Sequence, residues 1–157
     1  INPHVTLEAH ALRLTEANAE HLISSHDLVL DGSDNFDTRY LVNKVAAETR
    51  TPLVAAAIGR WEGQLSTYRP WLGGPCYACI FPQRPAEGLM PTCAEAGVMG
   101  ALAGVMGSMQ AAEALKLITG AGSPLDGRLL LYDALGAETR TIRLKKAPEC
   151  PVCGHLS

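Results

Sequence analysis

Residues 27–57 read DLVLDGSDNFDTRYLVNKVAAETRTPLVAAA and decide the fold that we expect. The runs Asp27–Asp31 and Pro52–Ala57 are short and mostly apolar, which is typical of buried strands. Between them, apolar residues recur at helical spacing and predict a helix over Phe36–Arg50. A strand, a helix and a second strand in this order favour a parallel pair of strands covered by the helix.

The segment before residue 27 extends this alternation. Val5–Leu14 has an extended pattern, and Thr15 is a residue type that caps helices, here one that continues to about Ser24. The expected order is therefore strand, helix, strand, helix, strand. This order is typical of the doubly wound α/β class, with a Rossmann-like, mostly parallel sheet whose ligands bind beyond the carboxyl ends of the strands.

Later segments predict antiparallel additions to the sheet and one long helix. Gln64–Tyr68 follows the preceding strand at a distance typical of a hairpin, and Arg128–Leu135 with Glu138–Lys145 predicts a second, C-terminal hairpin. A helix is expected over Val98–Ile118, whereas residues 77–92 show no regular pattern and are interpreted as a loop. All 157 residues are interpreted as one domain.

Gly100, Gly104 and Gly107 recur at helical spacing within the long helix. A face without side chains lets another helix or backbone approach closely, although the same pattern also occurs in helices that contact lipid. We favour close packing, because the longest uncharged stretch, residues 96–112, is shorter than the roughly 20 apolar residues that span a bilayer. No association with a membrane is expected.

Composition disfavours other classes of function. The net charge of −3 provides no basic field for a nucleic-acid backbone, so nucleic-acid binding is not expected as the main activity. The first residues, Ile1–His4, do not resemble a secretory signal peptide, and a cytoplasmic location is expected. In that reducing compartment, cysteine pairs indicate metal or redox chemistry rather than structural disulfides.

Two C-x-x-C hooks are the sharpest chemical signal. Cys76 and Cys79 form the first hook, and Cys150 and Cys153 form the second. Paired hooks that a fold can bring together suit one tetrahedral zinc ion, and four thiolates leave no open position, so this four-cysteine zinc site would be structural. Two unrelated thiol pairs and a redox pair are the alternatives. The fifth cysteine, Cys93, lies between the hooks.

Three runs of sequence and the two hooks together resemble one family. The runs Asp31–Tyr40, Glu62–Gln64 and Thr92–Met99, with both hooks, are similar to the MoeB/ThiF-type, E1-like adenylating enzymes that activate ubiquitin-like sulfur carriers, and to the MoeB branch most of all. The motifs follow the family order over essentially the whole chain. The resemblance implies an adenylyltransferase, a homodimer, that uses ATP with magnesium to activate the C-terminal carboxylate of a carrier ending in Gly-Gly.

The resemblance leaves the carrier open. A carrier of the molybdopterin-synthase small-subunit type, served by a sulfur donor protein, is the first expectation, and a carrier of the thiamine or another sulfur-transfer pathway is the second. A different class is a noncatalytic, zinc-stapled module that binds a ubiquitin-like partner. Each alternative predicts the same fold, so the sequence does not separate them.

The resemblance also assigns residue roles. It implies that Asp34 binds magnesium, with Asn35 beside the nucleotide phosphates. Arg39 could hold a phosphate or carboxylate, or form a structural salt bridge instead. Asp31 is a weaker candidate that could cap or turn the chain. Cys93 matches the crossover-loop cysteine, which in some members attacks the acyl adenylate to give a thioester or takes part in an acyl disulfide with a sulfur donor, and which other members do not need.

One departure from the family concerns the residues that bind the nucleotide. Family members begin with a Gly-rich phosphate loop, an acid that holds the ribose and clustered basic residues, whereas no Gly-x-Gly-x-x-Gly sequence occurs in these 157 residues. Residues 1–157 are therefore expected to be the carboxyl-terminal part of a single adenylating domain. By themselves they are expected to catalyse little or no ATP–pyrophosphate exchange, because the triphosphate charge would be insufficiently stabilised.

Overall fold

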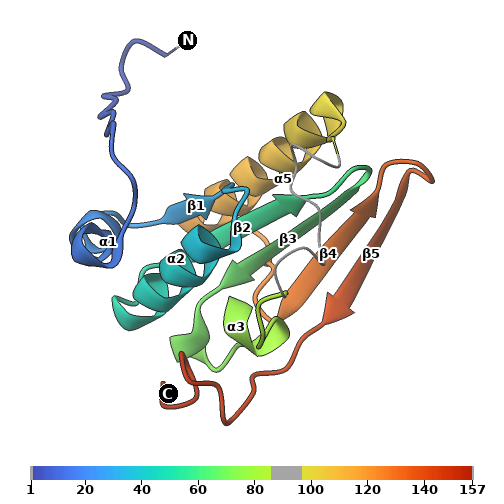
Figure 1. Cartoon of the computed structure of the whole chain (residues 1–157). Coiled ribbons are helices and arrows are strands. Elements are labelled where there is room, and N and C mark those ends of the chain that lie inside the picture. Colours follow the sequence, from blue (N-terminus) through green and yellow to red (C-terminus); the bar gives the residue numbers. More distant parts are fainter. Residues whose placement is uncertain (1, 86–96, 157) are drawn as a thin grey trace.

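Five strands form one sheet in the order of the sequence, and the computed structural model describes residues 2–85 and 97–156. The strands are β1 (Val29–Asp31), β2 (Leu53–Ile58), β3 (Glu62–Tyr68), β4 (Arg128–Asp133) and β5 (Glu138–Arg143). β1 and β2 pair in parallel, and the other three pairings are antiparallel, as Figure 1 shows. The predicted β2–β3 and β4–β5 hairpins are thus confirmed.

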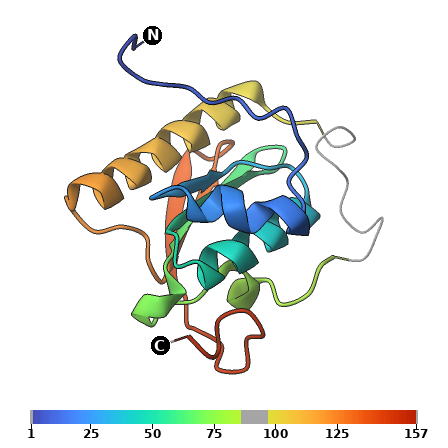
Figure 2. The same cartoon turned by 90° about the vertical axis from the view of Figure 1, so that its left-hand side faces the viewer.

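Helices cover both faces of this sheet. They are α1 (Glu16–Ser24), α2 (Phe36–Glu48), α3 (Tyr77–Ile80) and α5 (Gly100–Thr119), with a short 3-10 helix, η1 (Pro70–Leu72). Figures 1 and 2 show α1, α2 and α3 on one side of the sheet and α5 on the other. The α/β class and its doubly wound arrangement are therefore confirmed.

The core consists of two apolar layers, because side chains of a strand alternate between its faces. Leu53 and Ala55 of β2 pack against α1 and α2, whereas Val54 and Ala56 pack against Leu102 and other residues of α5. All four of these β2 side chains are at most 8% exposed. This two-sided burial explains why β2 reads as a continuous apolar run rather than an alternating one.

Two parts of the expected alternation are wrong. The sheet is mixed rather than mostly parallel, because only residues 59–61 separate β2 from β3, and so short a connection requires antiparallel pairing. In the described residues no strand precedes α1. Val5, Leu7 and Leu12 are each more than half exposed, so the apolar side chains of this segment contribute little to the core.

The expectation of an irregular segment from residue 77 onward is also corrected. The first cysteine hook folds into the single helical turn of α3, with Cys76 as its N-cap and the Cys79 N–H donating to the Cys76 carbonyl over 3.1 Å. A turn of four residues is too short to produce a helical repeat of apolar residues. The sequence pattern therefore could not distinguish this turn from a loop.

The glycine stripe of α5 does not pack closely against any described residue. A Cβ atom placed on Gly100, Gly104 or Gly107 would meet nothing within 4 Å. Close approach occurs instead at Gly63 in β3, where a Cβ atom would lie 2.4 Å from the Met106 Sδ. Met106 is 1% exposed, so the missing side chain of Gly63 is what lets α5 lie against the sheet.

Among the helices that the structure describes, none has the length and apolarity required to cross a bilayer.

Candidate functional site

The chain turns sharply at the carboxyl end of β1, where the sequence predicts a ligand-binding site. Asp31 is 6% exposed, and its Oδ1 accepts the Ser33 backbone N–H over 2.8 Å. This hydrogen bond closes an Asx turn and directs the following residues away from the sheet. Of the two roles considered for Asp31, the structure shows the turn.

Asp34 lies in this turn with its side chain exposed. The Asn35 Oδ1 accepts the Thr38 N–H over 2.9 Å and caps α2, while the Asn35 Nδ2 points to the Asp34 Oδ1 at 3.5 Å. Within the described residues the Asp34 carboxylate forms no ion pair. The negative charge of Asp34 is therefore not neutralised by a described residue.

Arg39 fastens this turn to the sheet. The guanidinium donates through Nη1 to the Ala56 carbonyl over 3.2 Å and through Nη2 to the Ser33 carbonyl. Neither partner is a carboxylate, so the salt bridge considered from the sequence does not occur with a described residue. In this geometry Arg39 joins α2, β2 and the Asp31–Asn35 turn through backbone carbonyls.

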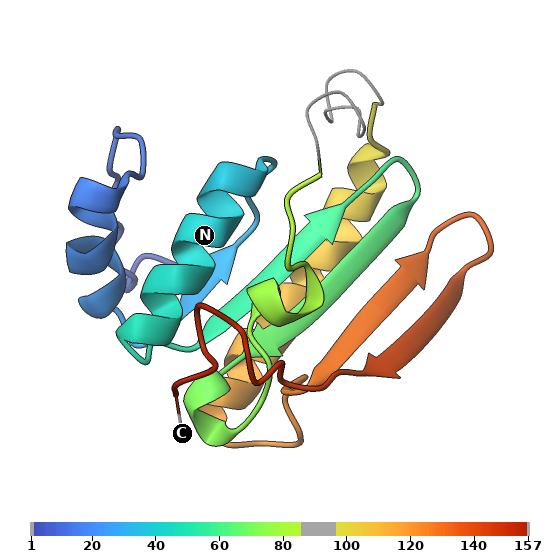
Figure 3. The same ribbon diagram turned by 60° about the horizontal axis from the view of Figure 1, so that its bottom comes forward.

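The two cysteine hooks meet, although about half the chain separates them. The Sγ atoms of Cys76, Cys79, Cys150 and Cys153 all lie within 4.8 Å of one another. Three of these separations measure 3.4, 3.6 and 3.9 Å, and a tetrahedral ion with Zn–S bonds near 2.3 Å requires sulfur separations of about 3.8 Å. Figure 3 shows the C-terminal segment running beside α3, where this cluster forms. The four sulfurs thus suit one tetrahedral metal ion.

Polar groups around the cluster favour bound thiolates. The Ala147 N–H donates to the Cys79 Sγ over 3.4 Å, and the Nδ2 of buried Asn43 lies 3.7 Å from the Cys76 Sγ. Burial, with Cys79 nearby, raises the pKa of the Cys76 thiol to about 11, and burial also raises the pKa of Cys153. A divalent cation would offset this cost of burying negative charge.

The pKa of Cys150 is shifted in the opposite direction to those of Cys76 and Cys153. Burial alone would raise its pKa, but hydrogen bonds from the Cys153 and Val152 backbone amides favour the thiolate, and the pKa is lowered. These amide hydrogen bonds thus favour the thiolate form of Cys150, which is the form that binds a metal ion.

The segment after α3 is anchored to α2. The Tyr40 hydroxyl donates to the Phe81 carbonyl over 2.6 Å. Arg84 pairs with Asp37 and lies over the Tyr40 ring, 5.1 Å from its centroid. These contacts hold the chain on the Asp34 side of α2 up to residue 85. Cys93 lies outside the described residues, so its predicted chemical role stays a prediction.

Sequence reasoning missed three buried polar residues, and two of them, Asn43 and Gln110, hold the first hook and the β1 edge in place. Asn43 accepts the Tyr77 N–H over 2.8 Å and so positions the first hook. The Gln110 Nε2 donates to the carbonyls of Asp31 and Val54, and Glu113 is 5% exposed. A polar residue on an otherwise apolar helix face is the sequence signal that could have indicated a buried polar contact. Gln110 is an example, because it follows Leu102 and Met106 at four-residue intervals.

Together these features define a Rossmann-like α/β domain with an acidic turn at a strand end and a tetrahedral cysteine cluster. Residues 1–152 match the ThiF family. Because this match covers nearly all of the chain, the chain belongs to the ThiF family.

Several curated relatives are similar over the whole chain. A sulfur carrier protein adenylyltransferase of Thermus thermophilus is 51% identical, and the aligned part covers 98% of this chain and 58% of the relative. The SAMP-activating enzyme E1 of Haloferax volcanii is 46% identical, covering 99% and 57%. The adenylyltransferase and sulfurtransferase MOCS3 of Bos taurus is 45% identical, covering 99% and 34%. The chain thus spans between a third and three fifths of these relatives.

Solved structures share the fold. Escherichia coli MccB with ATP superposes with a TM-score of 0.74 at 20% identity, covering 93% of this chain and 45% of that chain. The complex of MccB with MccA-N7isoASN gives a TM-score of 0.75 at 19% identity, covering 93% and 46%. At this level of identity the likeness shows the fold alone.

Proposed function

We propose that the full-length protein adenylates the C-terminal glycine carboxylate of a ubiquitin-like sulfur-carrier protein. The observation that carries the proposal is the placement of Asp34, whose exposed carboxylate lies at the carboxyl end of β1 without an ion-pair partner among the described residues. Ligands of doubly wound folds bind at this edge. The name of the Thermus thermophilus relative, which is 51% identical, supports the reaction class.

The chemistry requires charge control at this edge. The carrier carboxylate would attack the α-phosphorus of ATP, forming a carboxyl–phosphate bond while pyrophosphate leaves. Magnesium would neutralise the phosphate oxygens, and a carboxylate oxygen of Asp34 is a suitable ligand for it. Asn35 would lie beside the phosphates. Arg39, which is bound to two backbone carbonyls, would keep the Asp31–Asn35 turn in place. The remaining phosphate contacts would come from residues of the full-length protein outside this chain.

The cysteine cluster would have a structural role. We infer that it holds zinc, because four sulfur ligands at tetrahedral separations suit this ion and leave no open coordination position for catalysis. The bound ion would connect α3 to the C-terminal segment.

The finer assignments follow the family resemblance. We propose a carrier of the molybdopterin-synthase small-subunit type, with a thiamine-pathway carrier as the alternative, and a homodimeric enzyme in the cytoplasm that works with a sulfur donor protein. Cys93 would displace AMP from the acyl adenylate by thiolate attack at the acyl carbon, which gives a thioester. Its replacement by serine would leave the adenylation step intact and stop this transfer.

ATP–pyrophosphate exchange that depends on a carrier ending in Gly-Gly tests the proposal. Full-length protein is expected to catalyse exchange only when the carrier is present. Asp34→Asn should lower kcat about 100-fold or more, because it removes a charged metal ligand from the transition state. Asp27→Asn, an exposed carboxylate at the start of the same β1 region, is the matched control and should keep normal exchange. Normal exchange by Asp34→Asn would exclude the magnesium role of Asp34, and full-length protein that binds the carrier without any exchange would favour the noncatalytic module.

A further inference from the structure

A groove lies at the end of the sheet opposite to Asp34. β3 runs antiparallel to β2, so Tyr68 at the end of β3 pairs with Leu53 at the start of β2. The residue that follows, Arg69, lines one side of the groove, and the segment after β5, Leu144–Lys146, lines the other. The cavity measures about 510 Å³. The groove is therefore separate from the carboxyl end of β1, where Asp34 lies. It is large enough to bind a ligand bigger than a simple ion.

Positive charge predominates in this groove. Arg69, Lys145 and Lys146 line it, and Asp126 is the single acidic residue among the lining residues. The chain as a whole has a net charge of −3, so the groove departs from the charge of the rest of the molecule. Lys145 is exposed and forms no hydrogen bond or ion pair with the described residues. A ligand with negative charge would complement this surface.

Two of the cations are held in fixed positions. Arg69 donates through Nε and Nη2 to the two carboxylate oxygens of Asp126, at 3.0 and 2.7 Å. Lys146 donates to the carbonyls of Pro70 and Leu156. The Arg69 Nη1 and the third Lys146 donor are left for a ligand. Fixed donors lose little conformational entropy on binding.

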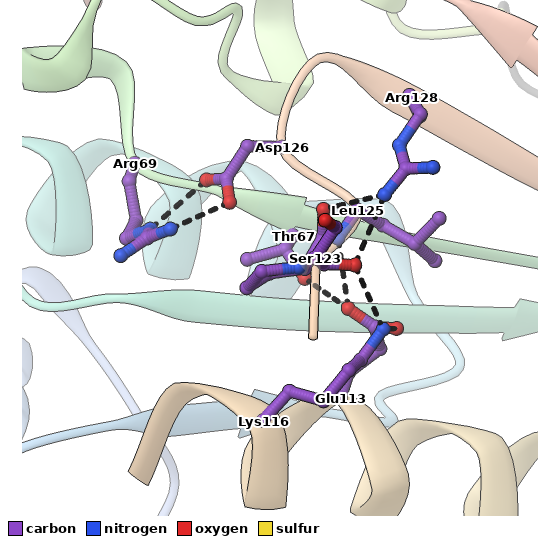
Figure 4. A network of polar contacts seen from close by, with 9 residues as sticks. Thr67, Arg69, Glu113, Lys116, Ser123, Leu125, Asp126 and Arg128 are labelled. Atoms are coloured by element: carbon purple, nitrogen blue, oxygen red, sulfur yellow. Dashed lines mark hydrogen bonds and ion pairs between the residues drawn. The ribbon is translucent and has the colours of Figure 1, made fainter. Parts of the chain in front are cut away.

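A buried carboxylate fixes the wall that carries Asp126, as Figure 4 shows. The Oε2 of Glu113 accepts the Thr67 hydroxyl over 3.1 Å and the Leu125 N–H over 2.8 Å, while Lys116 pairs with the same side chain. Arg128 donates to the carbonyl groups of the segment just before Leu125. This wall is thus anchored from inside the domain, and Arg69 is oriented through it.

Three glycines line the groove. Gly73 and Gly74 follow η1, and a Cβ atom on Gly73 would meet nothing within 4 Å. Gly127 lines the groove beside them. Apolar side chains lie next to the glycines, and among these Leu72 is 63% exposed. Glycines permit close approach of an extended chain, and Leu72 offers an apolar contact beside the cations.

We propose that this groove binds an extended segment of a partner protein in which carboxylate side chains alternate with apolar ones. The carboxylates would contact Lys145, Lys146 and the Nη1 of Arg69, and the apolar side chains would pack on Leu72. The bound segment would lie next to the cysteine cluster, because Pro75 directly precedes Cys76 and Lys146 directly precedes Ala147, whose N–H donates to the Cys79 Sγ. The site does not depend on the proposed adenylation, which takes place at the other end of the sheet.

The probe is a short synthetic peptide that alternates Glu and Leu, and its control is the isosteric peptide that alternates Gln and Leu. Titration into isotope-labelled full-length protein should shift the amide signals of Gly73, Gly74 and Gly127 with the acidic peptide and leave them unchanged with the neutral one. Lys145→Glu should weaken the affinity about fivefold or more, because it reverses an exposed charge in the site. Lys44→Glu, at an exposed lysine of α2 outside the groove, should leave the affinity unchanged.

Four results would overturn the proposal. They are equal binding of the acidic and neutral peptides, shifts confined to residues outside the groove, equal affinities of the two lysine variants, and no shift at a peptide concentration on the order of 1 mM, the weak limit of specific recognition. Displacement of the peptide by inorganic phosphate at similar concentration would also count against it, since this result would identify a site for small anions. Because carrier-dependent exchange is measured separately, failure here leaves the adenylation proposal standing.

Discussion

Arg39 is held by backbone carbonyls rather than by an acidic side chain. The sequence suggested a phosphate contact or a salt bridge, and the structure instead has the guanidinium bound to the carbonyls of Ser33 and Ala56. A planar donor with several N–H groups suits two carbonyls on different segments, whereas a lysine ammonium binds as a point charge. Arg39 therefore fixes the turn that carries Asp34 to β2, and we propose that it acts by positioning this turn.

Arg39→Lys should separate positioning from phosphate binding. We expect kcat for exchange to fall about 10- to 100-fold, because small displacements of a positioned group cost this much, while the KM for ATP changes little. Arg128→Lys is the matched control, since Arg128 also binds two backbone carbonyls, but at the other end of the sheet. Steady-state exchange kinetics measure both constants. An increase in KM with unchanged kcat would instead identify Arg39 as a direct phosphate contact.

Asp31 and Asp34 show what a sequence can and cannot say about a residue. Both acids lie at a predicted strand end, and the pattern alone could not assign different roles to them. The structure separates them by burial, because Asp31 is 6% exposed and closes a turn, whereas Asp34 is exposed. Three-dimensional surroundings, rather than residue type, make this difference.

At the level of elements, periodic segments were predictable and short or polar ones were not. Helix α2, strand β2 and both hairpins were predicted within a few residues, because their apolar residues repeat over many positions. Helix α3 is too short to show a repeat of apolar residues. Most of the apolar side chains of Val5–Leu14 are exposed, although the sequence pattern predicted a strand there. The side chains of Gln110 and Glu113 form hydrogen bonds with residues far away in the sequence. A local sequence pattern therefore could not predict these contacts.

The glycines give a testable contrast between two elements. Gly63→Ala should destabilise the protein by about 1–3 kcal/mol, because the new Cβ atom would overlap buried Met106. Gly107→Ala in the exposed face of α5 should instead stabilise it by about 0.5–1 kcal/mol through helix propensity. Denaturant unfolding of both variants measures the difference. If Gly107→Ala were as destabilising as Gly63→Ala, the exposed α5 face would be covered in the full-length protein.

For the whole molecule, the cysteine cluster connects parts of the chain that local structure leaves apart. The hooks join α3 to the C-terminal segment, and the structure confirms that they meet, as their spacing predicted. Residues 144–156 of this segment have no strand or helix of their own. We therefore expect the proposed metal ion to contribute to their position beside α3, together with the hydrogen bonds of Leu144, Lys146 and Ala147.

Removal of the proposed zinc ion should loosen this arrangement. Cys76→Ser is expected to lose bound zinc, measured by elemental analysis, and to lower the free energy of unfolding by several kcal/mol, of the order of 10 at most. Cys93→Ser should keep its zinc, because Cys93 belongs to neither hook. Zinc affinity should rise with pH, since the raised pKa of Cys76, about 11, means that binding must displace protons throughout the neutral range. Full zinc content in Cys76→Ser, or an affinity independent of pH, would contradict this account.

The central claim is that a carrier carboxylate attacks the α-phosphorus of ATP at the β1 edge. It is tested most directly with a carrier whose C-terminal carboxylate is labelled with oxygen-18, incubated with full-length protein, ATP, magnesium and a thiol acceptor. The attacking oxygen becomes the bridge to phosphorus, and cleavage at the acyl carbon then leaves it on AMP. Mass spectrometry should therefore find AMP carrying one labelled oxygen. Unlabelled AMP, or ADP together with labelled phosphate, would contradict the account.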